Sequence, residues 1–281
     1  MMPQGSAMGK LTQDINESVA RVVAFLCRNP TVFVSETDIH VLMMRELMKI
    51  PALDPDRLLH VTSLSIGQNQ YRLPSKSKYA TMLVHKEYGH NTGRGERSDI
   101  VIFDPSDVAV IDDPINLKAG RKYLKPSYIF EFGTEKAAGT VEKFEEHMRS
   151  DLRKLSGARE AGYLIHIQRT YARSRLGTKT LDAHRAKYEA YRDRAMNVWG
   201  ATRMKERFRL VIVFVEIGVP SRRVTHKLWM FDPVSCTWMA DVRLDEIHEK
   251  IQASLTAQGG ADICQFEMNA TGGHSRPSSS A

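Results

Sequence analysis

GERSDIVIFD (residues 95–104) and SYIFEFGTEK (127–136) each place one carboxylate within an otherwise apolar strand pattern. Asp99 opens the first pattern and Glu131 lies inside the second. Alternate residues of a strand share a face, so two paired strands can bring Asp99 and Glu131 to one point. The first pattern is short and rich in branched residues, which predicts a central strand covered on both faces.

Two neighbouring buried carboxylates are costly unless a proton or a cation compensates their charge. A divalent ion does this, and hard oxygen ligands favour Mg²⁺. Such an ion activates water and stabilises charge on a phosphoryl oxygen. The alternative is that Asp99 pairs with Arg94 or Arg97 and that Glu131 lies on a solvated face.

The rest of the chain alternates between helical and strand periodicity, which predicts one mixed α/β domain. We expect helices at 11–28, 35–50, 139–156, 179–198 and 243–257. We expect strands at 60–73, 79–88, 98–104, 127–132, 162–168, 209–218 and 226–232, and a polar connection at 105–127 with a small hairpin at 108–111. The predicted domain spans 11–258, with a core at 35–168 and an extension at 169–258, between disordered tails at 1–10 and 259–281.

Composition narrows the class of protein. The chain has 281 residues, 42% of them apolar, without an apolar run that predicts a membrane span and without a signal-peptide pattern at its start. Cys27, Cys236 and Cys264 are far apart, which favours a reducing, cytoplasmic location. Zinc-hydrolase, Walker, dinucleotide and Gly-x-Ser-x-Gly motifs are missing from the sequence.

Positive charge is concentrated in the segment 169–209, which has twelve Lys/Arg and four acidic residues in a chain of net charge +7. Such a segment fits the phosphate backbone of a nucleic acid, and an acidic protein partner explains the charge equally well. Four interleaved aromatic residues are candidates for stacking on bases: Tyr171, Tyr188, Tyr191 and Trp199. The alternative is that Tyr188, Tyr191, Ala195 and Val198 form the buried stripe of a cationic surface helix.

Over roughly 35–168 the chain resembles the PD-(D/E)XK nuclease superfamily, which has the restriction-endonuclease-like fold. The matching pieces are SETDIH, VHKEY, RSDIVIFD, FEFG, DLRKL and YLIHI, in the order of that family's α-β-β-β-α-β core. The resemblance implies a magnesium- or manganese-dependent deoxyribonuclease. It implies that Asp99 and Glu131 are catalytic residues that bind the metal.

One position departs from the family pattern. The family places a lysine two residues after the glutamate, where this chain has Gly133. Lys136 is the nearest replacement and Lys154, on the following helix, is the second. We expect the helical stripe of Lys143, His147, Asp151 and Lys154 to be a solvated edge.

Two further acids are auxiliary candidates at the same site. Glu36 is expected to interact with the N-terminus of its own helix, and Glu87 to be an acid at the sheet edge. The alternative function is a degenerate nuclease that binds nucleic acid or an acidic protein without cleavage, and a homodimer is the default oligomer.

Overall fold

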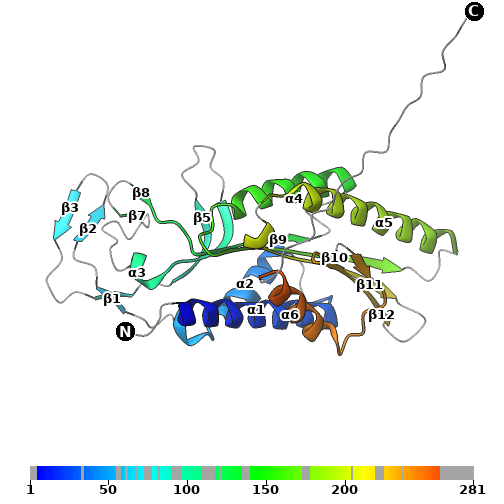
Figure 1. Cartoon of the computed structure of the whole chain (residues 1–281), viewed down its shortest axis with the longest axis horizontal. Coiled ribbons are helices and arrows are strands. Elements are labelled where there is room, and N and C mark those ends of the chain that lie inside the picture. Colours follow the sequence, from blue (N-terminus) through cyan, green and yellow to red (C-terminus); the bar gives the residue numbers. More distant parts are fainter. Residues whose placement is uncertain are drawn as a thin grey trace, which may run out of the picture.

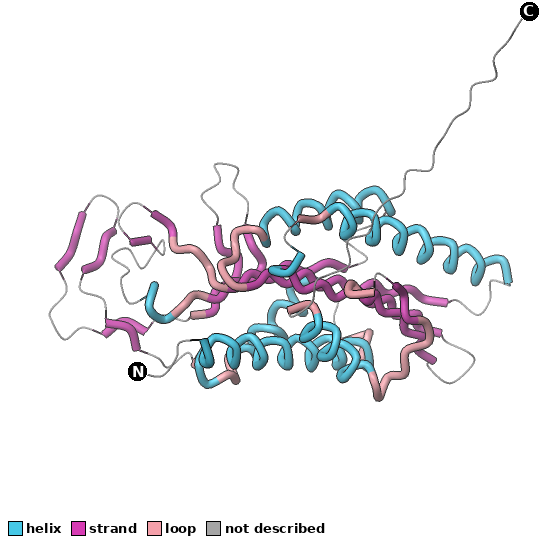
Figure 2. The backbone as a smooth tube through the Cα atoms, in the orientation of Figure 1, coloured by secondary structure: helices cyan, strands magenta, loops and turns pink. Residues whose placement is uncertain are grey.

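The protein is represented by a computed structural model, which describes residues 5–32, 35–54, 58–60, 63–66, 69–72, 78–80, 83–89, 97–108, 118–119, 122–134, 140–172, 178–203, 205–218, 225–235 and 237–259. Seven strands form one mixed sheet between two layers of helices, so the α/β class is confirmed (Figures 1 and 2). In sheet order the strands are β13 (Thr237–Met239), β12 (Thr225–Asp232), β11 (Phe208–Gly218), β10 (Ala161–Ala172), β9 (Tyr128–Thr134), β6 (Arg97–Ile102) and β5 (Val84–Gly89).

The central strands are parallel and the outer strands are antiparallel. β9, β10 and β11 run parallel, with one helix in each connection, whereas β5, β6 and β9 form an antiparallel meander. All seven residues of β9 are buried, because helices cover both faces of the sheet there. β9 therefore lies at the junction of the two patterns of pairing.

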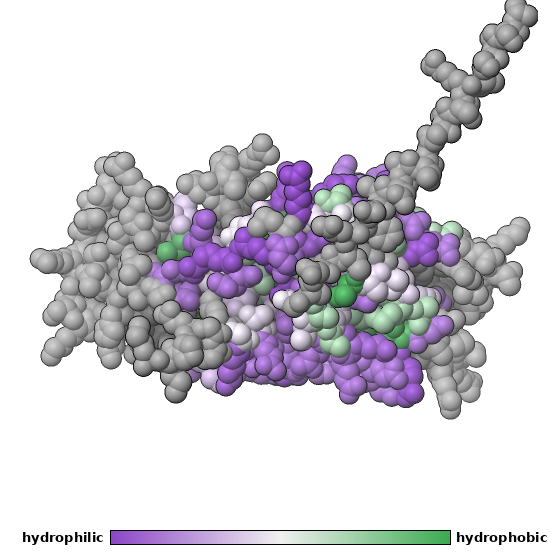
Figure 3. All heavy atoms as spheres, in the orientation of Figure 1, coloured by the Kyte–Doolittle hydropathy of each residue, from purple (hydrophilic) through white to green (hydrophobic). Residues whose placement is uncertain are grey.

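Helices cover both faces of the sheet (Figure 1). The first face holds α1 (Gly5–Arg28), α2 (Glu36–Leu47) and α6 (Ile247–Ala257), and the second holds α4 (Val141–Leu155) and α5 (Thr178–Ala201). In the view of Figure 3, hydrophilic residues line the outer side of both helical layers. Among the described helices, none has the length and apolar character to cross a membrane.

The two helices that border the candidate site start with capped N-termini. Ser35 and Asp38 form the predicted capping box of α2, and the Thr140 side chain accepts a hydrogen bond from the Lys143 N–H at the start of α4. The apolar stripe of α4 is buried as predicted: Phe144, Met148, Leu152 and Leu155. The cap and the stripe together fix which side of α4 faces the sheet.

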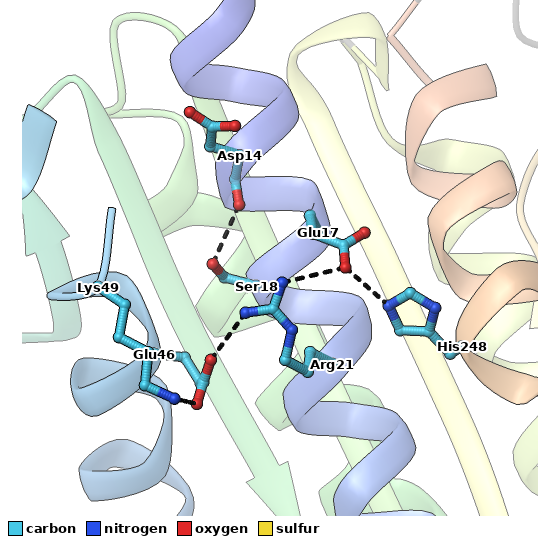
Figure 4. A network of polar contacts seen from close by, with 7 residues as sticks. All are labelled: Asp14, Glu17, Ser18, Arg21, Glu46, Lys49 and His248. Carbon is cyan, nitrogen blue, oxygen red and sulfur yellow. Dashed lines mark hydrogen bonds and ion pairs between the residues drawn. The ribbon is translucent and has the colours of Figure 1, made fainter. Parts of the chain in front are cut away.

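Polar contacts join α1 to both of its helical neighbours (Figure 4). The Arg21 guanidinium lies 3.0 Å from Glu46 on α2 and 3.1 Å from Glu17 on its own helix. His248 of α6 lies 3.1 Å from the same Glu17 oxygen. These pairs are partly exposed to solvent, so each stabilises the layer by only about 0–1 kcal/mol.

Several connections differ from the prediction. The segment 60–73 contains short strands, β1 (Leu58–His60), β2 (Ser63–Ile66) and β3 (Asn69–Arg72), and β4 (Lys78–Ala80) follows them. The connection 105–127 contains α3 (Pro105–Val108) and a hairpin of β7 (Lys118–Ala119) and β8 (Lys122–Tyr123), so Val108 ends a helix instead of opening a hairpin. Two 3₁₀ turns complete the chain, η1 (Pro51–Leu53) and η2 (Lys205–Arg207).

The chain ends and the last strand also differ in detail. α1 begins at Gly5, six residues before the predicted helix, and β13 is a short strand that the sequence pattern does not predict. The tail predicted from Gly259 onward lies outside the described residues except for Gly259 itself.

Candidate functional site

The candidate site lies where the ladder between β6 and β9 ends. The ladder between these strands runs to the pair Ile100 and Phe130, and β9 continues to Thr134. Asp99 and Glu131 are the next residues on the two strands. The Phe132 N–H donates to Asp99 Oδ2 at 2.8 Å, so a carboxylate replaces the strand partner that β6 no longer supplies.

Glu36 repeats this arrangement two residues further along β9. The Thr134 N–H donates to Glu36 Oε1 at 3.2 Å. Alternate amides of a strand point to the same side, so Asp99 and Glu36 occupy the same edge of β9. Glu36 lies in the first turn of α2, as expected for an acid that interacts with the helix N-terminus, and its carboxylate also ties α2 to the sheet.

Glu131 is buried and pairs with a lysine from α4. Only 1% of the Glu131 side chain is exposed, and the Lys154 ammonium lies 2.6 Å from its Oε2. Lys154 Nζ also lies 3.1 Å from Asp151 Oδ1, one turn earlier on the helix. Lys154, the second of the two lysine candidates, is thus at the site. Lys136, the first candidate, lies outside the described residues.

Two histidines approach the other oxygen of Asp151. His147 Nδ1 lies 3.0 Å from Asp151 Oδ2, and His166 Nε2 of β10 lies 3.7 Å from it. These three residues form the His–Asp–His group. Asp151 is 3% exposed in its side chain, so the expectation of a solvated helix edge is wrong for this part of the stripe, although Lys143 is exposed.

The position of His166 explains why residue 133 is glycine. Gly133 and His166 are register partners on β9 and β10. A Cβ atom at residue 133 would lie 2.4 Å from His166 Cε1, closer than real Cβ atoms approach a neighbour. A lysine at residue 133 therefore clashes with the imidazole, and the cation comes to Glu131 from the helix instead.

The electrostatics of the acid cluster (Glu36, Asp99, Glu131 and Asp151) are dominated by burial and by like charge. Burial raises the pKa of Glu131, and the charges of Asp99 and Asp151 raise that pKa further despite the Lys154 ammonium. Burial and the Asp99 charge likewise raise the pKa of Glu36. The cluster therefore has more carboxylate than its one lysine neutralises.

The remaining titratable groups respond to Asp151. Burial opposes ionisation of Asp151, but His147, His166 and Lys154 hold its pKa below the usual range. The Asp151 carboxylate raises the pKa of His147, whereas burial lowers the pKa of His166. A neutral His166 keeps a lone pair for a ligand.

A second group of ligand-type atoms lies on the other side of Asp99. His40 of α2, Glu87 of β5 and Asp99 each bring one ligand atom to within 4.8 Å of the others. Glu87 is exposed on the edge strand and has a left-handed backbone with φ of 55°. Its position on the sheet edge agrees with the prediction, and its carboxylate is nevertheless beside Asp99.

Buried polar atoms without a hydrogen-bond partner are concentrated at the candidate site. In the described part of the chain, ten buried side-chain polar atoms lack a hydrogen-bond partner, and seven of them belong to His40, Glu131, His147, Asp151 and His166. Buried polar atoms in folded proteins are usually satisfied, so such a concentration points to a ligand or ion. Sequence reasoning missed His40 and His166. The signal for His166 was a polar residue inside the apolar pattern GYLIHIQ, the same signal that identified Glu131.

The basic segment 169–209 divides into structural and exposed residues. Arg169 and Arg209 are buried and donate to backbone carbonyls, so they are unavailable to phosphates. The stacking prediction is wrong for Trp199, which is fully buried and donates to the Pro233 carbonyl, and Tyr191 is buried too. Arg203 is exposed. The side chains of Tyr171 and Tyr188 lie outside the described residues.

Comparison of this chain with protein-family models, with curated proteins and with solved structures finds no match. Its function is therefore inferred from the site residues and their geometry alone.

Proposed function

We propose that this chain is a metal-dependent nuclease that hydrolyses DNA phosphodiester bonds with a PD-(D/E)XK-like site. The observation that carries the proposal is the acid cluster itself. Four carboxylates come from three layers of the fold, and two of them, Glu131 and Asp151, contact Lys154. Burial, together with the charge of neighbouring carboxylates, raises the pKa values of Glu36 and Glu131. A divalent cation compensates this excess of negative charge.

The strand order supports a restriction-endonuclease-like core. The chain passes from α2 into the meander β5–β6–β9, crosses through α4 and returns as β10 parallel to β9. This is the α-β-β-β-α-β order that the resemblance implies. It places Asp99 and Glu131 on neighbouring strands at the point where those strands part.

The residues fit a magnesium or manganese ion. Asp99 is 20% exposed in its side chain, so one end of the site reaches solvent, and Glu131 Oε1 is buried without a hydrogen-bond partner. Asp99 and Glu131 would hold the ion, with Glu36 and Glu87 as nearby carboxylates. When bound, the ion lowers the pKa of a water molecule and stabilises charge on a phosphoryl oxygen.

Lys154 takes the role of the family's lysine in this proposal. Its ammonium is fixed between Glu131 and Asp151, so its orientation is set before substrate binds. From there it orients the attacking water and offsets negative charge as the phosphodiester reacts. His166 prevents the usual lysine position on β9 from being used.

DNA would be held through phosphate contacts by exposed basic residues of α5 and the turn after it. Arg194 and Arg203 are exposed in the described part of this segment, although Arg194 lies 2.8 Å from Glu145. Such contacts give affinity that falls with salt and does not depend on sequence.

The second candidate function is a non-catalytic nuclease fold that binds nucleic acid or an acidic protein. One observation favours it. Lys154 already occupies one Glu131 oxygen at 2.6 Å, so Glu131 has a partner before a metal arrives. In that case the Lys154–Glu131 ion pair takes the place of a metal ion and has a structural role only.

Cleavage of plasmid DNA in the presence of Mg²⁺ or Mn²⁺ separates the two functions. We expect the chain to nick or linearise plasmid, and Asp99→Asn, Glu131→Gln and Lys154→Met to reduce the rate at least a hundredfold. Asp245→Asn and Lys250→Met are the matched controls, because both side chains are exposed on or beside α6.

Each outcome of this assay has one meaning. DNA binding at low salt without cleavage supports the non-catalytic function and overturns the nuclease. Cleavage that survives Asp99→Asn and Glu131→Gln shows that the hydrolysis comes from another site or a contaminant, and it also overturns the proposal.

A further inference from the structure

We propose that the His–Asp–His group is a second metal site, which binds a transition-metal ion of the Zn²⁺ or Co²⁺ type. This site is distinct from the magnesium site proposed above and does not rest on it. His147 and Asp151 come from α4, and His166 comes from β10 beneath that helix. Each offers one ligand atom, and the three atoms lie within 4.8 Å of one another.

The distances from Asp151 Oδ2 to the two histidine nitrogens are close to what such an ion requires. Two ligands about 2.0–2.1 Å from a tetrahedral ion lie roughly 3.3–3.5 Å apart. Asp151 Oδ2 is 3.0 Å from His147 Nδ1 and 3.7 Å from His166 Nε2. Each of these two distances differs by only a few tenths of an ångström from that spacing, and the two histidine nitrogens lie within 4.8 Å of each other.

The same atoms are buried and without hydrogen bonds. His166 is fully buried and neither of its ring nitrogens has a hydrogen-bond partner. Asp151 Oδ2 and His147 Nδ1 are buried atoms that lie 3.0 Å apart without the geometry of a hydrogen bond. A histidine that only filled space would leave two polar atoms unsatisfied, at a cost of about 1–3 kcal/mol each. A metal bond satisfies one nitrogen of each ring and the carboxylate oxygen at once.

The surroundings hold the ligands in place and leave a route for the ion. Gly133 leaves room for the His166 imidazole, since a Cβ atom there would overlap the ring. The two Asp151 oxygens contact different groups: Oδ1 faces Lys154 at 3.1 Å and Oδ2 faces the histidines. His147 is 31% exposed in its side chain, so the ion enters from that side and water completes its shell.

The chemistry of the ligands separates the two sites. Two imidazoles and one carboxylate favour Zn²⁺, Co²⁺ and similar ions over Mg²⁺, which prefers oxygen. Lys154 Nζ faces Asp151 Oδ1 at 3.1 Å, whereas the ion would bind Oδ2, so the two cations contact different oxygens of this carboxylate.

Cobalt titration tests the site directly. The full chain, stripped with EDTA and desalted, is titrated with Co²⁺ while its visible d–d absorption is recorded, and Zn²⁺ is then added. We expect one equivalent of Co²⁺ to give the absorption of a low-coordinate site with nitrogen ligands and Zn²⁺ to abolish it. His147→Gln and His166→Gln should each weaken binding about tenfold or more.

His248→Gln is the matched control, since His248 pairs with Glu17 on the outer helices. The double variant Asp99→Asn/Glu131→Gln should keep the cobalt signal, which distinguishes this site from the proposed magnesium site. Absence of the signal in the wild-type chain, or a signal unchanged by His147→Gln, overturns the proposal. His147 is partly exposed, so that variant decides the matter even if His166→Gln does not fold.

Discussion

The imidazole of His166 lies directly over the Cα atom of Gly133, its register partner on the neighbouring strand. This contact links a missing side chain on β9 to a buried ring on β10. It also moves the cation that faces Glu131 from the strand to α4, where Lys154 supplies it. The glycine at residue 133 and the position of the cation on α4 thus have one steric cause, the His166 ring.

Gly133→Ala should destabilise the protein by about 1–3 kcal/mol, because the new methyl group forces the His166 ring from its place. Urea unfolding measures the change. Gly200→Ala is the control: Gly200 lies in α5 with open space around it, so alanine there should stabilise by up to about 1 kcal/mol. The steric explanation fails if Gly133→Ala/His166→Ala recovers none of the stability that Gly133→Ala loses.

Lys154→Met should destabilise the metal-free chain by about 3 kcal/mol near neutral pH, because Glu131 and Asp151 lose their cation. The loss should be larger above about pH 9, where Glu131 is ionised and the missing cation leaves its charge uncompensated. A double-mutant cycle with Glu131→Gln measures the coupling by urea unfolding. An equal loss at both pH values would show that Lys154 acts through packing alone.

The metal-free chain should lose stability as the pH rises above the carboxyl range. Burial and the charges of Asp99 and Asp151 raise the pKa of Glu131 from 4.5, so the folded state keeps a proton that the unfolded chain has released. The free energy of unfolding then falls by up to about 1.4 kcal/mol per pH unit between the two pKa values.

Glu131→Gln tests this dependence, since the amide cannot ionise. The variant should have a flatter pH profile than the wild-type chain in EDTA, and Glu249→Gln, on the exposed start of α6, should not change the profile. Parallel profiles for wild type and Glu131→Gln would assign the pH dependence to other groups.

If the magnesium site exists, Mn²⁺ should raise the melting temperature of the wild-type chain, because an ion that binds only the folded state stabilises it. At a hundredfold excess over its dissociation constant the gain is about 2.7 kcal/mol. Asp99→Asn should abolish the shift while its amide oxygen still accepts the Phe132 N–H. A full shift in that variant contradicts the assignment of Asp99.

The basic segment should separate into two classes by substitution. Arg203→Ala should lower the salt dependence of DNA binding by about one unit of slope and leave stability unchanged. Arg209→Met should instead cost about 1–3 kcal/mol of stability, because its guanidinium donates to backbone carbonyls of Glu206 and Phe208. Gel shifts over a salt series and urea unfolding distinguish these classes.

Periodicity predicted the main helices and the sheet strands because their apolar positions face one shared core. The capping box at Ser35 was predictable for a different reason, because its hydrogen bonds join residues close together in the sequence. What the sequence could not show was which residues meet across layers. The spacing of Asp99 and Glu131 suggested neighbouring strands, but the approach of Glu36 and His40 depends on how α2 packs.

The basic segment shows a second limit. Charge counting treated its Arg residues alike, yet Arg169 donates to the Pro30 carbonyl and is buried. A long cationic side chain can satisfy distant backbone oxygens, and one-dimensional patterns do not record those partners. Burial of the Trp199 ring was likewise decided by the strands beneath α5, not by its neighbours in sequence.

The amides of Phe132 and Thr134 donate to carboxylates instead of to a neighbouring strand. Each of these protons therefore experiences directly any change in the charge on Asp99 or Glu36. Their proton resonances are built-in reporters: a titration followed by nuclear magnetic resonance would read the state of each acid separately, without a substrate and without altering a single side chain.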